Sequence, residues 1–369
     1  GPSDFGNLGP FCHRILACQA AGASAVAKCQ ANSESYCEEQ IGPSMSSVAV
    51  VGGGMAGVAA ARVLCQRGYH VRLYERSEEL GGRLGNAQLG LGQVGLGATY
   101  VKAKDPIFKA EVAQLQEKGL VSEWNVGTPY FIESPGTFVA KPELKGGDAW
   151  YVGRPDMGSF VLLEDTKGLT RLCGKEVSSV CWKEASWLIN GEDEVSSLIL
   201  ALPVAQIRAL LAPGSLEELL PKETLDKDFE KGRVAAAFAF PESLMLPFCL
   251  AFVKDSPISL VLNDTSRTSG PDGEGPEVWV VQTTTEWAAD CKKAETSENE
   301  MCRSLLAEFL RIVGKAAANV DHLKAIHWLY GDGDYQLPQG CVVDPRRRLC
   351  LCGDWCYNGR VEGAFLILG

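Results

Sequence analysis

The sequence has little basic charge, no long apolar run and no paired-cysteine motif. Its 35 Lys and Arg residues are outnumbered by 46 Asp and Glu residues, and the formal net charge is −11. This argues against nucleic acid or an anionic membrane as the main partner, because both attract clustered basic residues. No stretch of roughly 18 uninterrupted apolar residues is present, so no transmembrane segment is predicted. The closest stretch, residues 234–253, contains Glu242 and two prolines and is typical of two buried strands around a turn.

The 14 cysteines are scattered along the 369 residues, and none forms a Cys-x-x-Cys pair. This distribution favours reduced thiols and an intracellular protein, in the cytoplasm or in an organelle such as a plastid or mitochondrion. It also argues against a zinc site. The histidines show no metal-ligating cluster and no Ser-His-Asp triad, so we predict no metal.

Strands and helices alternate from Met45 onward, as in α/β proteins, and the chain is long enough for two domains. Residues 1–44 lack this pattern. We treat them as an extension of unknown role, and contact with a protein partner is one role they could serve. Residues 265–277 are polar and rich in Gly and Pro, which predicts a loop. The apolar helical pattern of residues 361–369 predicts a final helix that is cut short.

The stretch "VAVVGGGMAG" places Gly52, Gly54 and Gly57 directly after an apolar strand and directly before a helix. In this motif the first glycine makes a tight turn and the second lets the backbone approach a pyrophosphate. The third lets the helix pack closely on the strand. The start of the helix offers unpaired N–H groups to the phosphates. The stretch therefore predicts a dinucleotide site.

The next predicted strand, "HVRLYE", ends in Glu75, close to the expected spacing of about 20 residues from the glycines. An acid there can accept both ribose hydroxyls and would repel a 2′-phosphate, which disfavours NADP. NAD and FAD share this fingerprint, so other residues must distinguish them.

Two further motifs serve that purpose. "ELGGRLG" contains Gly81, Gly82 and Arg83, where the glycines permit close backbone approach and the arginine supplies a fork for phosphate. "LCLCGDWCYNGRVEGAF" contains a strand, then Gly353 and Asp354, then a helix that begins near residue 361. Asp354 could accept a hydrogen bond from a polyol, and the start of the helix faces a ring carbonyl or developing anion.

Together these motifs resemble the FAD-dependent amine oxidase superfamily, and within it the renalase-like members. The resemblance covers essentially Met45 to Gly369 and includes "VGLGATYV", "KEVSSVCWKEASWLI" and "LILALPVAQI". It implies an α/β fold with a Rossmann-type FAD-binding domain, a doubly wound parallel sheet, and a second α+β substrate domain on a mixed or antiparallel sheet. The expected FAD-binding segments are 45–105, 161–215 and 326–369, and the expected substrate-domain segments are 106–160 and 216–325.

The resemblance also implies a set of FAD-binding residues. The glycine turn would hold the pyrophosphate, Glu75 the adenosine ribose, Val177 the adenine and Asp354 the ribityl chain. Residues 97–99 would pass beside the isoalloxazine, and residues 361–362 would lie at its pyrimidine end. The full expected set is Gly52, Gly54, Met55, Ala56, Gly57, Glu75, Arg76, Gly82, Arg83, Gly97, Ala98, Thr99, Val177, Gly353, Asp354, Val361, Glu362 and Ala364.

The resemblance further implies chemistry in which a small hydride or amine donor reduces the flavin and oxygen accepts the electrons, giving peroxide. Renalase-like members oxidise isomeric dihydronicotinamides, which we favour, and amine oxidases oxidise C–N bonds. A third interpretation is an accessory subunit with little or no catalysis. The stretch "AIHWLYGDGDYQLP" provides His327, Trp328 and Tyr330 as candidate catalytic residues, and Trp355 with Tyr357 offers another aromatic pair.

Overall fold

The chain folds into two units in the computed structural model. The structure describes residues 47–90, 92–164, 166–225, 231–268, 275–330, 337, 340–357 and 359–367. The first unit draws on the ranges Gly1–Gly82, Val161–Phe229 and Gly333–Gly369, and the second on Arg83–Phe160 and Glu230–Asp332. The predicted N-terminal extension, residues 1–44, lies outside the described residues, as does Tyr335.

The unit boundaries differ from those expected after residues 105, 215 and 325. Residues 83–105 belong to the second unit, because β5 (Val101–Lys102) pairs with β9 (Trp150–Gly153) of that unit. Residues 326–328 also belong there, because they complete strand β19 (His322–Trp328). The expected boundary after residue 105 therefore separates β5 from its partner strand, and the one after residue 325 cuts through β19.

The first unit is built on a six-stranded sheet with the order β10-β2-β1-β14-β21-β20. All adjacent strands are parallel except β20 and β21, which are antiparallel. Strands β1 and β14 are almost fully buried, as expected for a sheet covered on both faces. The strands are β1 (Ser47–Val51), β2 (His70–Tyr74), β10 (Leu169–Leu172), β14 (Ser197–Leu200), β20 (Val342–Asp344) and β21 (Leu349–Leu351).

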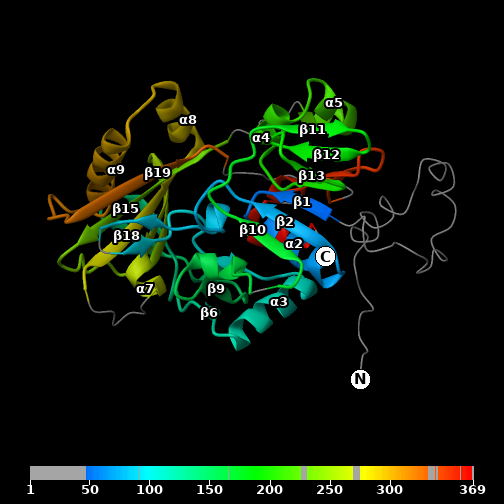
Figure 1. Cartoon of the computed structure of the whole chain (residues 1–369). Helices are drawn as coiled ribbons and strands as arrows, with labels where there is room; N and C mark the ends of the chain where they lie inside the picture. The colour runs from blue at the N-terminus through cyan, green and yellow to red at the C-terminus, as the bar shows by residue number, and fades with distance from the viewer. Residues whose placement is uncertain are drawn as a thin grey trace. The chain divides into compact units, whose positions relative to one another are not determined.

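The chain order of this sheet reverses at β1. Helix α2 (Met55–Gln66) leads from β1 to β2 and packs against both strands (Figure 1). The chain later returns to the other side of β1 as β14. In sheets of this kind, ligands bind beyond the carboxyl ends of the strands at the point of reversal. The predicted parallel Rossmann sheet is confirmed.

A small antiparallel sheet and short helices complete the first unit. The small sheet has the order β11-β12-β13. The stretch 196–211 forms the predicted strand and helix, β14 followed by α4. The remaining elements are β11 (Val180–Lys183), β12 (Ser186–Ile189), β13 (Asp193–Val195), α4 (Val204–Leu210), α5 (Ser215–Leu219), α6 (Lys222–Leu225), η4 (Asp354–Cys356) and α10 (Arg360–Leu366).

The second unit is built on a seven-stranded sheet with the order β19-β15-β18-β17-β16-β7-β8. Neighbours are antiparallel except β16 and β7, so the sheet is mixed, as predicted. Residues 234–253 form two strands around a turn, but these strands are not neighbours. The strands are β7 (Tyr130–Ser134), β8 (Thr137–Ala140), β15 (Arg233–Phe240), β16 (Leu250–Val253), β17 (Ile258–Asn263), β18 (Glu277–Thr283) and β19.

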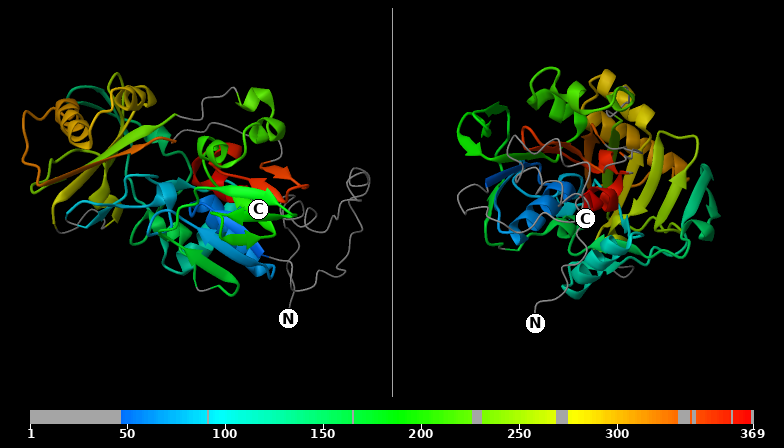
Figure 2. Two further views of the ribbon diagram at one scale, coloured as in Figure 1. Left: turned by 45° about the horizontal axis from the view of Figure 1, so that its top comes forward. Right: turned by 90° about the vertical axis from the view of Figure 1, so that its right-hand side faces the viewer.

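Helices α8 (Thr285–Lys293) and α9 (Glu298–Ile312) cover one face of this sheet, as both views of Figure 2 show in gold. Helix α9 begins with a capping box between Ser297 and Glu300. Its apolar side packs on alternate residues of β15 and β18, with Phe238, Trp279 and Phe309 in ring contact. This face of the sheet is therefore the core face.

The predicted loop 265–277 is partly helical. Its first residues form α7 (Asp264–Thr268), and residues 269–274 lie outside the described residues. The helix forms because the Asn263 side chain accepts a hydrogen bond from Ser266 N at 2.9 Å. The other elements of this unit are η1 (Gly82–Leu84), β3 (Ala87–Gln88), β4 (Gln93–Val94), β5, α3 (Pro106–Glu117), β6 (Val121–Glu123), η2 (Pro142–Leu144), β9 and η3 (Met157–Val161), of which η1 and η3 cross the boundary.

Candidate functional site

The three glycines after β1 occupy different environments. Gly52 has a φ of +106°, and a Cβ there would collide with the carbonyl oxygen of Ala201. A Cβ on Gly57 would collide with the carbonyl oxygen of Gly52. A Cβ on Gly54, by contrast, would lie 4.0 Å from the nearest described atom outside its neighbours, Gly81 O. Packing therefore requires glycine at positions 52 and 57, whereas a Cβ on Gly54 would overlap no described atom.

Helix α2 begins immediately after this turn. Gly54 is its N-cap residue and has no side chain to cap the helix, and the first intrahelical bond runs from Val58 N to Gly54 O. The N–H groups of residues 55–57 precede that bond, so the helix itself does not use them. Met55 and Ala56 are buried, which fixes the start of the helix. The start of α2 is suited to hold an anion.

Glu75 follows β2 directly and is only 8% exposed. One carboxylate oxygen accepts a hydrogen bond from Gly53 N at 2.7 Å, and the other accepts one from Ser77 N at 2.9 Å. The acid is therefore held against the glycine turn. Each carboxylate oxygen has two acceptor positions, so these bonds leave capacity for hydroxyl donors.

The second glycine pair packs against the first turn. Gly81 N donates to Gly53 O at 2.9 Å, and a Cβ on Gly82 would lie 3.3 Å from the Cα of Gly54. Arg83, expected near phosphate, donates to the carbonyl oxygen of Tyr330 at 3.2 Å. Arg76 is exposed. The two glycine motifs are therefore in direct contact. Arg83 is hydrogen-bonded to Tyr330, which belongs to the same unit as Arg83.

The Val177 segment is tied to the same edge of the sheet. Lys175 N donates to Glu75 O at 3.0 Å, and Gly174 N donates to Ser77 O at 2.8 Å. Val177 follows two residues later and is half-buried. The structure therefore brings the residues predicted for ribose and adenine into one neighbourhood.

The third motif begins at the end of β21, beside β14. The indole nitrogen of Trp355 donates to Leu202 O at 3.0 Å, which ties the two strand ends together. Asp354 is half-buried, and its carbonyl oxygen accepts from Tyr357 N at 3.1 Å and Gly359 N at 2.9 Å. Trp355 is buried, so it supports the loop and is not available as a wall of an aromatic cage.

Helix α10 starts at Arg360, one residue before the predicted start. A Cβ on Gly363 would collide with the carbonyl oxygen of Tyr357, so the helix rests directly on the preceding loop. Ala364 is buried, and residues 361–362 are half-buried. The expected strand, loop and helix of the third motif are present.

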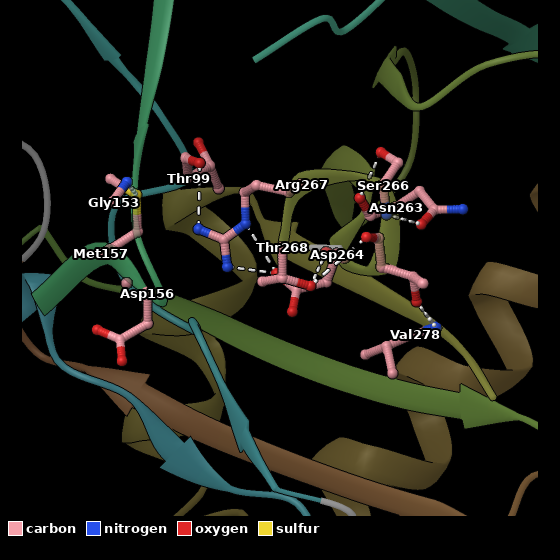
Figure 3. A network of polar contacts seen from close by, with 12 residues as sticks. Thr99, Gly153, Asp156, Met157, Asn263, Asp264, Ser266, Arg267, Thr268 and Val278 are labelled. Atoms are coloured by element: carbon pink, nitrogen blue, oxygen red, sulfur yellow. Dashed lines mark hydrogen bonds and ion pairs between the residues drawn. The ribbon is translucent and has the colours of Figure 1, made fainter. Parts of the chain in front are cut away.

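In the second unit, the backbone of residues 95–99 is held by side chains from three elements. We call these residues the 95–99 segment. The segment also packs against the backbone of Arg83. Ala98 N donates a hydrogen bond to Arg83 O at 2.8 Å, and a Cβ on Gly97 would collide with that oxygen. Three of its carbonyl oxygens accept hydrogen bonds from side chains. Trp328 Nε1 donates to Leu96 O at 2.8 Å, and Gln282 Nε2 donates to Gly97 O at 2.8 Å. Arg267 Nη1 donates to Thr99 O at 3.3 Å (Figure 3).

The three predicted catalytic residues are not brought together. Trp328 faces the 95–99 segment, and Tyr330 contributes its carbonyl oxygen to Arg83. His327 lies next to Trp328 on the strand and so faces the opposite side of the sheet. It pairs with Val234, which belongs to the core face. Burial and the charge of Lys292 lower the pKa of His327, which favours a neutral structural imidazole.

Gln282 and Arg267 were not among the predicted site residues. Gln282 carried a signal, because it interrupts the apolar alternation of "EVWVVQTTT" on the face opposite Trp279. Arg267 carried none, since it lies in the stretch interpreted as a polar loop. In the described ranges, no group of three or more His, Cys, Asp or Glu side chains could hold a metal ion. No helix within those ranges is long and apolar enough to cross a membrane.

Comparison with known proteins gives the fold class. Residues 50–115 match the family of NAD(P)-binding Rossmann-like domains. The structure resembles a protein of Exiguobacterium sp. 255-15, provisionally described as a protoporphyrinogen oxidase, with a TM-score of 0.70 and 11% identity over 89% of this chain and 98% of that one. It also resembles putrescine oxidase bound to putrescine, with a TM-score of 0.58 and 15% identity over 88% and 97%. The chain therefore has the FAD/NAD(P)-binding Rossmann fold of amine oxidase and protoporphyrinogen oxidase structures.

Sequence relatives match over shorter stretches. A stretch of 38 residues, 10% of this chain, is 66% identical to carotenoid phi-ring synthase of Streptomyces griseus. A stretch of 130 residues, 34% of this chain, is 35% identical to pseudooxynicotine dehydrogenase of a Pseudomonas species. The chain spans 7% and 25% of the lengths of these two relatives. Neither relative is described as a renalase-like protein.

Proposed function

We propose that this protein is an FAD-dependent oxidoreductase. The observation that carries the proposal is the contrast within the glycine turn. Packing explains Gly52 and Gly57, whereas a Cβ on Gly54 would overlap no described atom, and Gly54 stands at the start of a helix without a side-chain cap. A dinucleotide pyrophosphate needs both features, because it approaches the backbone closely and accepts hydrogen bonds from the helix N–H groups.

The other residues at this edge of the sheet fit the rest of the cofactor. Glu75 would accept ribose hydroxyls with its remaining acceptor capacity, and the backbone at Val177 would lie against adenine. Asp354 would meet the ribityl chain. The start of α10, at residues 361–362, would lie near the pyrimidine end, and Ala364 would support it from the buried side. Together these assignments favour FAD over NAD. NAD has neither a ribityl chain for Asp354 nor an isoalloxazine ring for the start of α10.

The resemblance assigns the backbone of Gly97, Ala98 and Thr99 to the isoalloxazine. Within the second unit, three side-chain donors hold the backbone of the 95–99 segment in place. FAD, when bound, takes a hydride equivalent from a substrate and passes the electrons to oxygen, with peroxide as product. The chain itself contributes orientation and exclusion of water, as is usual for cofactor enzymes.

For the substrate we favour isomeric dihydronicotinamides, as in renalase-like proteins. The support comes from the face of the sheet that carries Gln282 and Trp328. None of the described residues on that face of β15, β18 and β19 is acidic, so these strands offer no carboxylate to a cationic amine. The residues are Arg233, Ala235, Ala237, Ala239, Val278, Val280, Gln282, His322, Lys324, Ile326 and Trp328.

Oxidation of an amine is the second candidate. It is favoured by the match to pseudooxynicotine dehydrogenase and by the fold shared with putrescine oxidase. An accessory subunit that binds FAD without turnover is the third candidate.

Anaerobic stopped-flow spectroscopy separates these candidates. The FAD-loaded protein is mixed with isomeric dihydronicotinamides or with primary amines and polyamines, and free FAD serves as the control. We expect the flavin absorbance to bleach within seconds with a dihydronicotinamide only, and oxygen to restore it with release of peroxide. Bleaching by amines alone would support the second candidate. Bound FAD that responds to neither class would leave the accessory subunit.

A further inference from the structure

The carboxylate of Asp193 accepts hydrogen bonds from three side chains of the first unit. Tyr74 Oη donates to Asp193 Oδ2 at 2.7 Å, and Arg72 Nη1 donates to Oδ1 at 3.1 Å. Lys175 Nζ donates to Oδ2 at 3.4 Å. Asp193 is the first residue of β13, whereas Arg72 and Tyr74 belong to β2 and Lys175 follows β10. One acid thus connects three segments that are distant in the chain.

Two of these three partners lie directly beside Glu75. Tyr74 is the residue before it, and Lys175 N donates to Glu75 O at 3.0 Å. Glu75 N in turn donates to Leu172 O at 3.0 Å, at the end of β10. Asp193 therefore holds the side chains of two residues that border the backbone of Glu75, and Glu75 is the acid assigned to the ribose.

The buried hydroxyl of Tyr74 fixes the place of the Asp193 carboxylate. Tyr74 is 1% exposed, so its O–H group needs an acceptor within the protein. The bond from Tyr74 is the main cause that lowers the pKa of Asp193, so the carboxylate is charged at neutral pH. Arg72 and Lys175 are 41% and 38% exposed, and exposed ion pairs contribute little to stability.

Attachment of the small sheet β11-β12-β13 does not require Asp193. Ser196, directly after β13, donates to Ser47 O from its backbone at 3.0 Å and from its hydroxyl at 2.7 Å. On β12, Trp187 Nε1 donates to Arg347 O at 2.6 Å. These bonds tie the small sheet to β1 and to the turn between β20 and β21. The bonds of Asp193 lead instead to the neighbours of Glu75.

We propose that Asp193 is a positioning residue for the adenosine half of FAD, which acts on Glu75 through Tyr74 and Lys175. This inference rests on the proposed function, because that proposal assigns Glu75 to the ribose and the backbone at Val177 to the adenine. Lys175 lies two residues before Val177, so its bond to Asp193 also restricts the segment assigned to the adenine. Asp193 itself need not touch the cofactor, and all five residues belong to the first unit.

Two substitutions remove this link in different ways. Asp193→Asn removes the charge, and the amide nitrogen cannot accept a hydrogen bond. Tyr74→Phe removes only the hydroxyl oxygen and keeps the buried ring. Glu194→Gln is the matched control, because it neutralises the next residue of β13. The carboxylate of Glu194 accepts from Ser186 Oγ at 2.7 Å, within the small sheet.

The test compares FAD with the analogue that lacks the 2′-hydroxyl of the adenosine ribose. Flavin fluorescence measures both dissociation constants, and thermal unfolding measures the stability of the cofactor-free protein. We expect the wild type to bind FAD about tenfold more tightly than the analogue, since the analogue loses a hydrogen bond to a charged carboxylate. In Asp193→Asn and Tyr74→Phe the affinity for FAD should fall, and the preference should decrease to about threefold or less.

A residue that only stabilises the fold would lower the unfolding temperature and leave the preference between the two ligands unchanged. Glu194→Gln should leave both affinities unchanged. If the wild type prefers FAD and both variants keep that preference in full, Asp193 does not position the adenosine half. If the wild type binds FAD and the analogue equally, the cofactor binds but Glu75 does not hold the ribose, and the inference is wrong.

Folding and cofactor binding give two further outcomes. If Asp193→Asn does not fold, Tyr74→Phe decides. If neither variant folds, the link is a folding determinant and the proposal is wrong. If the wild type binds neither FAD nor the analogue, the proposed function itself is wrong.

Discussion

The indole nitrogen of Trp328 donates a hydrogen bond to the carbonyl oxygen of Leu96 at 2.8 Å. Trp328 is the last residue of strand β19. Leu96 is the first of three residues in the 95–99 segment whose carbonyl oxygens accept from side chains, and Gln282 and Arg267 donate to the other two. A side chain predicted to take part in catalysis is therefore occupied with holding backbone. Leu96 is buried, so its carbonyl depends on this donor.

Replacing Trp328 by Phe should therefore destabilise the protein. The substitution keeps an aromatic ring but leaves the Leu96 carbonyl without its donor, at a cost of about 1–3 kcal/mol. Urea unfolding measures the change. Trp182→Phe, at a half-buried position on β11, should cost less. Unchanged stability together with a large loss of turnover would instead restore Trp328 as a catalytic residue.

Gly54→Ala should mainly weaken FAD binding, whereas Gly57→Ala should mainly destabilise the fold. The Cβ added by Gly54→Ala would overlap no described atom, so the protein should fold with a loss of at most about 1 kcal/mol, yet bind FAD at least tenfold more weakly. The Cβ added by Gly57→Ala would overlap the carbonyl of Gly52 and should destabilise the fold by about 1–3 kcal/mol or more.

Circular dichroism melts and FAD titration separate the two effects. Gly147→Ala is the control, because a Cβ there meets no described atom within 4 Å. Equal FAD affinity in wild type and Gly54→Ala would show that the turn does not hold the pyrophosphate.

Glu75→Gln should weaken both the turn and cofactor retention. The amide oxygen can accept from Gly53 N or Ser77 N, but the amide nitrogen cannot accept from the other. We expect a stability loss of about 1–3 kcal/mol from the unpaired buried N–H group, and a larger loss of FAD affinity. Chemical denaturation with and without FAD measures both. If FAD stabilises the variant and the wild type equally, Glu75 does not contact the ribose.

Stability should depend on pH through His327. Burial lowers the pKa of this histidine in the folded state, so the unfolded state binds more protons once the pH falls to its ordinary pKa of about 6.5. Stability should therefore decrease as the pH falls from about 6.5. His327→Gln should flatten that decrease. Identical pH profiles for wild type and His327→Gln would contradict this account.

The sequence predicted the glycine turn and the parallel sheet of the first unit, but not its boundaries, because the motifs of the turn are local. The strand, the glycine turn and the helix around Gly54 lie within a few residues of one another, and Glu75 ends the next strand. The spacing alone thus predicts the turn, the helix start and the position of the acid. The parallel sheet follows from the alternation of strands and helices.

The second unit depends on contacts between distant segments, which composition does not encode. Residues 83–105 join β9, Gln282 and Trp328, which lie about 50 to 230 residues further along the chain. Strand register decides toward which face of the sheet a residue points. His327 and Trp328 are adjacent in the sequence but lie on opposite faces of β19, so their position in one stretch did not show that they are apart. Arg267 lay in a short helix that looked like a loop.

FAD binding by the purified protein tests the central claim most directly. The protein is freed of any cofactor, titrated with FAD, separated from free cofactor by gel filtration and measured for flavin absorbance near ~450 nm. We predict one FAD per chain, with retention at least tenfold lower in Gly54→Ala. A folded, colourless wild-type protein after this treatment would contradict the proposal that the chain is an FAD-dependent oxidoreductase.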